Sequence, residues 1–352
     1  MPTNKITSTV TLSVYFEGTA NTISPITTQV GMFFATDAAI NITDPAVPCD
    51  PNAASTFKMG FNGCGVDYGM LGTIFAVGLQ EQCETVMARV RTLLNHYGCT
   101  VRLVCLGLSR GGIGGLMLAK QATHADGERL HVSLCLFDPV PGNLICTARW
   151  LDLFKKTTVA GCMDLTKCNT LRRILAIYPY EPLPDFAFHA PVLPNYPSSC
   201  EVEEDATLGC HQGALYPRQD FNPSDVLELA CWLSCSRIFN FMQDSGVCFA
   251  PKAQVADSWM VEMVRKVEGP LCHAIEQLVQ SRCPTRSSRI VHAHPLSAFI
   301  ESDHQSAARA AAASSTTPAL NLHHLRLLGR PLDAKHCILR VVRWHARSTH
   351  AD

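Results

Sequence analysis

The sequence has little charge and no long apolar run, and each absence excludes a class of protein. Charged residues make up 17% of the 352 residues and the formal net charge is −1, so no bulk attraction to nucleic acid is expected. No stretch of roughly 18 or more apolar residues occurs, which argues against a membrane span. The start of the chain lacks the apolar core of a signal peptide. We therefore expect a cytoplasmic protein, or one that is exported by a non-classical secretion system.

Cysteine is abundant, but its spacing fits neither a metal site nor a disulfide framework. The 17 cysteines include no C-x-x-C pair, and many stand within apolar runs, where a free thiol behaves as a small hydrophobe. Cys231 and Cys235 are four residues apart, but no His/Cys pair at zinc-like spacing accompanies them. Because the total is odd, reduced thiols are expected rather than complete pairing. We expect no metal and no other cofactor.

The most informative motif is a glycine-flanked serine that directly follows an apolar strand pattern. It reads Gly107-Leu108-Ser109-Arg110-Gly111, with the strand pattern at 101–106 and a glycine-rich helical pattern at 111–123. A strand, a sharp turn and a helix with serine at the apex are typical of the nucleophile elbow of α/β-hydrolases. Such a turn needs small residues two positions before and after the serine. The alternative is a glycine-rich turn without a catalytic role.

Strand and helix patterns alternate along the first part of the chain. Strands are predicted at 9–17, 101–106, 131–137 and 173–178. Helices are predicted at 74–97, 111–123, 223–244 and 256–280, with further helices within 142–172. Residues 22–56 are polar and predict a long loop. The β-α-β alternation predicts an α/β fold with a mostly parallel sheet flanked by helices.

Composition divides the chain into a domain, a linker and a tail. Residues 1–304 are assigned to one α/β-hydrolase-like domain, in which the irregular, proline-rich segment 179–200 is expected to form an inserted lid. Residues 305–318 are rich in Ala, Ser and Thr and predict a linker. Residues 319–352 form a basic, histidine-rich tail. For this tail we favour disorder over peripheral contact with an anionic membrane surface.

A serine nucleophile needs a base and an orienting acid, and the sequence offers candidates for both. Asp138 directly follows the predicted strand 131–137, and catalytic groups gather at the carboxyl ends of parallel strands. A plain turn at Asp138-Pro139 is the alternative. In α/β-hydrolases the acid follows the serine and the histidine comes last. That order leaves several histidines open as the base: His211, in a glycine-flanked loop, and also His189, His273, His292 and His294.

Acyl transfer also needs two preorganised donors for the oxyanion. The backbone N–H of Arg110 is one candidate, because Arg110 follows the nucleophile. The second donor could come from Gly18 or Thr19, in the loop after the first strand, where glycine permits close approach. The Arg110 side chain would either anchor the turn or meet an anionic head group, and we favour the structural role.

Several segments, in order, resemble one family of α/β-hydrolases. Phe16-Glu17-Gly18-Thr19-Ala20-Asn21 resembles the Phe-Asp-Gly-Thr-x-Asn opening of a family that includes type VI secretion phospholipase effectors. Later motifs of that family resemble the segments at 60–66, 107–112, 137–140 and 208–213. The resemblance covers about 9–245. Glu17 replaces the usual aspartate, and no proline precedes Gly209.

The resemblance implies a serine hydrolase that cleaves carboxylic esters through an acyl-enzyme. It implies a lipid substrate, with phospholipid acyl esters as the best candidate, and it favours His211 as the base beside Ser109 and Asp138. Two other interpretations stay open. One is a binding protein of the same fold without catalysis, and the other is a thioesterase or peptidase with the same triad.

Overall fold

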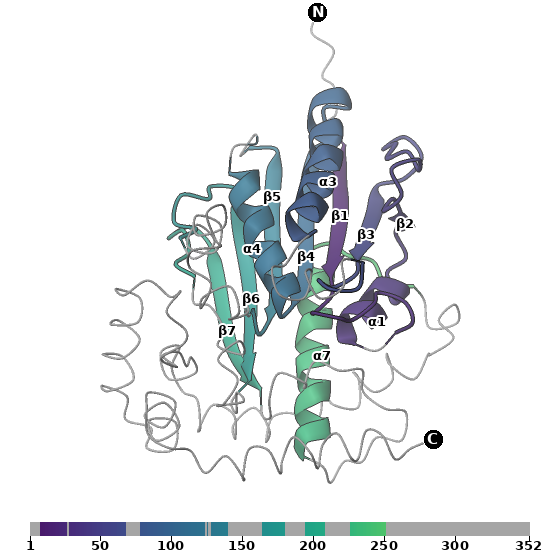
Figure 1. Ribbon diagram of the computed structural model, residues 1–352. Helices are drawn as coiled ribbons and strands as arrows, with labels where there is room; N and C mark the ends of the chain where they lie inside the picture. The colour runs from purple at the N-terminus through teal and green to yellow at the C-terminus, as the bar shows by residue number, and fades with distance from the viewer. Residues whose placement is uncertain are drawn as a thin grey trace, which may run out of the picture.

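A computed structural model describes residues 8–26, 28–67, 78–123, 125, 128–139, 164–179, 194–207 and 226–250. Its strands form one seven-stranded sheet in the order β2-β3-β1-β4-β5-β6-β7, and every pair is parallel (Figure 1). The strands are β1 (Thr9–Phe16), β2 (Ile40–Asn41), β3 (Thr56–Phe61), β4 (Thr100–Leu108), β5 (Leu130–Phe137), β6 (Leu171–Pro179) and β7 (Glu201–Thr207). The predicted α/β class with a parallel sheet is therefore confirmed.

Helices cover both faces of this sheet. They are α1 (Gln29–Thr36), α3 (Leu79–Arg91) with a π-helical turn after it (Thr92–His96), α4 (Arg110–Ala122) and α7 (Val226–Asp244). Helices α3 and α4 lie on one face, while α1 and α7 pack with the other (Figure 1). A strand that is buried on both faces has a nearly continuous run of apolar residues in its sequence, as β4 has.

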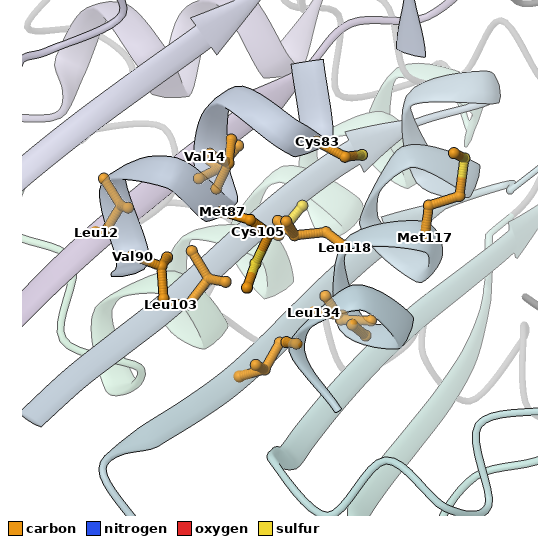
Figure 2. Close-up of a cluster of buried hydrophobic side chains, with 14 of the residues drawn as sticks. Leu12, Val14, Cys83, Met87, Val90, Leu103, Cys105, Met117, Leu118 and Leu134 are labelled. Carbon is orange, nitrogen blue, oxygen red and sulfur yellow. The ribbon is translucent and has the colours of Figure 1, made fainter. Parts of the chain in front are cut away.

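The core between the sheet and α3 and α4 contains cysteine and methionine beside the usual aliphatic residues. Figure 2 shows side chains of both helices meeting those of β1, β4 and β5. Cys83 and Cys105 in this core are fully buried free thiols, and so is Cys135 in the core on the opposite face of the sheet. Burial raises the pKa of Cys105 and of Cys135 well above the usual thiol value. These thiols therefore serve as packing groups rather than as nucleophiles.

The connections leave the centre of the sheet in opposite directions. After β1 the chain passes through α1 to β2 and β3 on one side, and after β4 it passes through α4 to β5 on the other. β1 and β4 are neighbours, so their carboxyl ends flank the point where the chain direction reverses. In open parallel sheets, ligands bind in the crevice at such a point.

Two expectations about the helices and strands need correction. The loop predicted at 22–56 is wrong in part, because it contains α1 and β2 and ends as β3 begins. Helix α1 has only eight residues, and a short apolar run among polar neighbours does not reveal its period. The strands β3 and β7 were not expected, since β3 lies in a glycine-rich stretch and β7 is mostly acidic.

The other expected elements have mixed outcomes. The strands at 9–17, 101–106, 131–137 and 173–178 and the helices at 111–123 and 223–244 are confirmed with shifted ends. The helix expected at 74–97 begins at Leu79 among the described residues. Most of 142–172 and of the expected lid lies outside the described residues, as do 256–280, the linker and the tail. Among the helices described, none is long and apolar enough to cross a membrane.

Candidate active site at the carboxyl edge of the sheet

Ser109 forms the turn between β4 and α4, in a backbone conformation that L-residues rarely adopt. Its φ is 56° and its ψ is −120°. Its N–H donates to the Phe137 carbonyl at 2.9 Å, and its own carbonyl accepts from Gly112 N–H at 2.9 Å. Such a conformation costs on the order of 1–3 kcal/mol and persists only where the surroundings enforce it. The sequence of strand, sharp turn and helix is the one that the motif predicts.

The glycines on either side of Ser109 are required by close backbone contacts. A Cβ on Gly107 would stand 2.4 Å from the Gly111 carbonyl oxygen, and one on Gly111 would stand 2.2 Å from the Phe16 carbonyl oxygen. Both distances are far below van der Waals contact, and backbone cannot move aside as a side chain can. The turn therefore packs directly against itself and against the end of β1.

Strained backbone gathers at this edge of the sheet. Among the described residues other than glycine, a positive φ occurs at Ala20 (63°), Ser109 (56°) and Asp138 (46°). These residues follow β1, β4 and β5, three adjacent strands. Residues in rarely populated conformations cluster at active sites and ligand clamps. This clustering marks the carboxyl edge as the candidate site.

Asp138 lies next to the serine turn. The last registered pair of β4 and β5 joins Leu108 to Phe137, so Ser109 and Asp138 occupy the next position on adjacent strands. Asp138 is buried, and its N–H donates to the Ile177 carbonyl at 2.8 Å. The structure thus brings the predicted nucleophile and the predicted acid together at one edge.

The loop after β1 is held tightly against the loop after β3. A Cβ on Gly63 would stand 1.7 Å from the Gly18 carbonyl oxygen, so only glycine fits there. The Ala20 N–H donates to the Cys64 carbonyl at 3.0 Å. The Gly18 N–H donates to the carboxylate of Glu17 at 3.2 Å. Of the two candidates for the second oxyanion donor, Gly18 is therefore engaged, and Thr19 follows it in a half-buried position.

Glu17 is the residue that sequence reasoning missed as a part of this site. Its side chain is 1% exposed and accepts a 2.6 Å hydrogen bond from the Thr28 hydroxyl. Burial raises the pKa of Glu17 from 4.5 to about 7, against the opposing effect of hydrogen bonds from Thr28, Gly18 and Gly31. Its replacement of the aspartate in the resembled motif was the available signal. A buried carboxyl group that titrates near neutrality is common at functional sites.

Helix α1 connects Glu17 to a second buried polar cluster. Thr28 caps the amino end of α1, where its hydroxyl also accepts from Gly31 N–H at 3.2 Å. At the other end Asp37 accepts hydrogen bonds from the Ser13 and Tyr15 hydroxyls. The Lys58 ammonium donates to the Asp37 carbonyl at 2.7 Å. Both ends of α1 are thus fixed to the sheet.

The Arg110 side chain is buried, in line with the structural role favoured for it. Only 7% of its surface is exposed. Burial lowers the pKa of Arg110, and the nearby Cys64 partly opposes that effect. Its position at the first residue of α4 places its backbone N–H directly after the serine. That position fits the expected oxyanion donor.

The described histidines lie away from Ser109. His96 precedes β4, and His131 pairs with Arg102 near the start of that strand, so both belong to the amino edge of the sheet. His211 lies outside the described residues, as do the other four histidines that the sequence left open. Within the described ranges, no group of three or more His, Cys, Asp or Glu residues could hold a metal ion.

Comparisons with known proteins add little to this geometry. No family model matches the chain, and neither does any curated protein. The crystal structure of an uncharacterised protein from Pseudomonas aeruginosa matches at 13% identity with a TM-score of 0.46. That match covers 92% of this chain, which spans 62% of the matched chain.

Proposed function

We propose that the protein is a serine hydrolase of the α/β-hydrolase type that cleaves carboxylic esters. The observation that carries this proposal is the strained turn of Ser109 at the point where the chain direction reverses in the sheet. Strain of this kind has no value for folding, whereas it presents a serine hydroxyl to a ligand at the sheet edge. The backbone contacts of Gly107 and Gly111 support the same interpretation.

The proposed chemistry is a two-step acyl transfer to water. The Ser109 hydroxyl attacks the ester carbonyl and passes its proton to the imidazole of His211, which then protonates the leaving alcohol. Water activated by the same imidazole hydrolyses the acyl-enzyme and restores the serine. Asp138 orients the imidazole and stabilises its charged form. The backbone N–H groups of Arg110 and Thr19 donate to the oxyanion.

The chain length after β7 is compatible with His211 as the base. Thr207, the last residue of β7, lies at the same edge of the sheet as Ser109, because all strands are parallel. β7 lies three strands from β4 in the sheet order, which corresponds to about 14 Å. Four further residues span at most about 14 Å when extended. A fully extended segment would just bridge this gap, whereas His96 and His131 lie at the opposite edge of the sheet.

The substrate class follows from the family resemblance. A lipid is proposed, with a phospholipid acyl ester first among the candidates. The segment 178–188, rich in aromatic residues and proline, would suit an acyl chain if it bordered the site. Most of this segment lies outside the described residues. Thioesters and peptides are the competing substrates, because the same triad cleaves both.

The test is a panel assay with phospholipids, a soluble short-chain ester, a thioester and a peptide. Wild type should hydrolyse the esters best, and Ser109→Ala should lose at least about a thousandfold in rate, because the nucleophile is gone. Asp138→Asn should lose on the order of a hundredfold or more, since it favours the wrong imidazole tautomer. Hydrolysis by Ser109→Ala at the wild-type rate would refute the proposal. An inactive wild type that still binds lipid would favour the binding-protein alternative.

A further inference from the structure

The carboxylate of Glu17 links the Gly18–Thr19 backbone, in the loop after β1, to the amino end of α1. In the proposed function this loop supplies the second oxyanion donor. Glu17 directly precedes Gly18 and accepts that residue's N–H at 3.2 Å. It also accepts the Thr28 hydroxyl at 2.6 Å, at the amino end of α1. The backbone N–H of Gly31, in the first turn of α1, stabilises the ionised form as well. A single carboxylate thus links the loop after β1 to a helix that is fixed at its other end by Asp37.

The partners of this carboxylate suit an ionised acid better than a neutral amide. The hydroxyl of Thr28 and the N–H groups of Gly18 and Gly31 are all donors toward it. An ionised carboxylate only accepts, so it can satisfy such a set of donors. A glutamine would turn its own NH2 group either toward the Gly18 N–H, which would then lose its acceptor, or toward the Thr28 hydroxyl, which would have to accept instead of donate.

We infer that Glu17 is a positioning residue: its ionised carboxylate fixes the Gly18–Thr19 backbone against α1, so that the Thr19 N–H is aimed at the oxyanion. This inference rests on the proposed function. Removal of the charge by protonation would loosen the loop without removing any catalytic group. Turnover should therefore require ionised Glu17 in addition to the neutral imidazole of the base.

The charged groups on the surrounding elements engage other partners. Helix α1 carries no charged residue. On β3, Lys58 donates to the carbonyls of Phe34 and Asp37 at the far end of α1. At the start of α4, Arg110 interacts electrostatically with Cys64. The raised pKa of Glu17 accordingly has burial as its largest cause, and the described groups that oppose it are hydrogen-bond donors.

The experiment is the pH profile of kcat/KM for a soluble ester, measured for wild type, Glu17→Gln and the exposed control Glu84→Gln. For wild type, log kcat/KM should rise with a slope approaching two below about pH 6, because two groups must lose protons. Glu17→Gln should reduce the slope to about one and lower kcat at pH 8 by about tenfold, since the loop loses its anchor. Glu84→Gln should match wild type.

A second pair of variants tests the same contact from the helix. Thr28→Val removes the hydroxyl donor that lowers the pKa of Glu17, so the rising limb of the kcat/KM profile should move to higher pH. Thr28→Ser keeps a hydroxyl donor and should return the limb to its wild-type position. Equal slopes in wild type and Glu17→Gln, or an unmoved limb in Thr28→Val, would overturn the inference and leave the hydrolase proposal standing. A falling limb above pH 7 that disappears in Glu17→Gln would also overturn it, because the neutral form would then be the active one. Failure to find any hydrolysis that depends on Ser109 overturns the proposed function and this inference together.

Discussion

At the residue scale, the turn of Ser109 requires residues without a Cβ atom at positions 107 and 111. The space that a methyl group would need at Gly107 or Gly111 is filled by carbonyl oxygens of the turn and of β1. These contacts bring the end of β1 directly against the turn between β4 and α4. The strain at Ser109 is held in place by the same contacts.

Gly111→Ala should destabilise the fold by several kcal/mol, whereas Gly98→Ala should cost only about 1 kcal/mol. The added methyl group of Gly111→Ala would stand 2.2 Å from the Phe16 carbonyl oxygen, a collision with backbone. At Gly98 the space is open, and only the positive φ of 69° is unfavourable for alanine. Chemical denaturation of both variants measures the difference. Equal losses would show that the packing at Gly111 is looser than described.

The pH dependence of stability should reveal the buried charge of Glu17 without any substrate. Its pKa is raised from 4.5 to about 7, so the folded state favours the protonated form. The stability associated with that proton is fully present below pH 4.5 and is lost as the pH rises through 7. Ionisation above that range costs roughly 3 kcal/mol of folding free energy.

Glu17→Gln avoids this cost, although it loses hydrogen bonds. The difference in melting temperature between Glu17→Gln and wild type should therefore become more positive between pH 5 and pH 8, on the order of several degrees. Thermal melts at a series of pH values measure it, with Glu84→Gln as the matched control. A difference that does not change with pH would mean that Glu17 is not a buried titrating group.

At the scale of elements, the strands and helices that could be predicted from the sequence are those with a clear local residue pattern. The apolar strands β4 and β5 and the glycine-rich start of α4 carry strong local signals, and so does the turn between them. Helix α1 and strand β7 do not, because their places are decided by partners distant in sequence. Val202 is the one aliphatic residue of β7 apart from Ala206, so its pairing with β6 is set by the sheet rather than by its own pattern.

The same division applies to the candidate site. Ser109 and Asp138 were found because each directly follows a recognisable strand. Glu17 was noticed only as a departure from the resembled motif, since its contacts with Thr28 and Gly31 depend on a helix that sequence reasoning did not find. The choice of His211 among the histidines needs positions that lie outside the described residues.

Arg173 on β6 connects the edge strand β7 to helix α7. Its guanidinium lies 3.5 Å from Glu201 and 3.4 Å from Glu203 on β7, and 3.6 Å from Asp244 on α7. It also stands over the Phe241 ring at 5.0 Å. One side chain of β6 thus ties the acidic edge strand to the helix behind the sheet.

Arg173→Met should lower the free energy of unfolding by about 1–2 kcal/mol, since a partly exposed ion-pair network and a cation–π contact are both lost. Raising the salt concentration should reduce the difference from wild type, because salt screens exposed charges. Arg91→Met, at an exposed position of α3, is the control and should change stability by less than about 0.5 kcal/mol. Denaturant titrations at two salt concentrations give both numbers. A loss in Arg173→Met no greater than in the control would contradict this account of the edge.

At the scale of the whole molecule, the described sheet is covered on both faces by residues that precede position 251. Truncation after Asp303 should leave the fold and the hydrolysis of a soluble ester unchanged, because the Ala-, Ser- and Thr-rich linker 305–318 cannot bury enough apolar surface to order itself. The alternative is that the apolar run 337–344 docks on the domain. Thermal melting and the ester assay test this. A fall in melting temperature of more than about 5 °C, or loss of soluble expression, would show that the tail contributes to the core.

In the proposed hydrolase the strained turn presents Ser109 as an activated nucleophile. The most direct measurement is labelling with a serine-reactive fluorophosphonate, with the modified residue located by mass spectrometry of the peptides. We predict labelling at Ser109, much slower labelling in Asp138→Asn, and no labelling at the exposed Ser24, which is not at the strained turn. Ser109→Ala should not react. Folded wild-type protein that fails to react at Ser109, or that reacts there no faster than Asp138→Asn, would contradict the account.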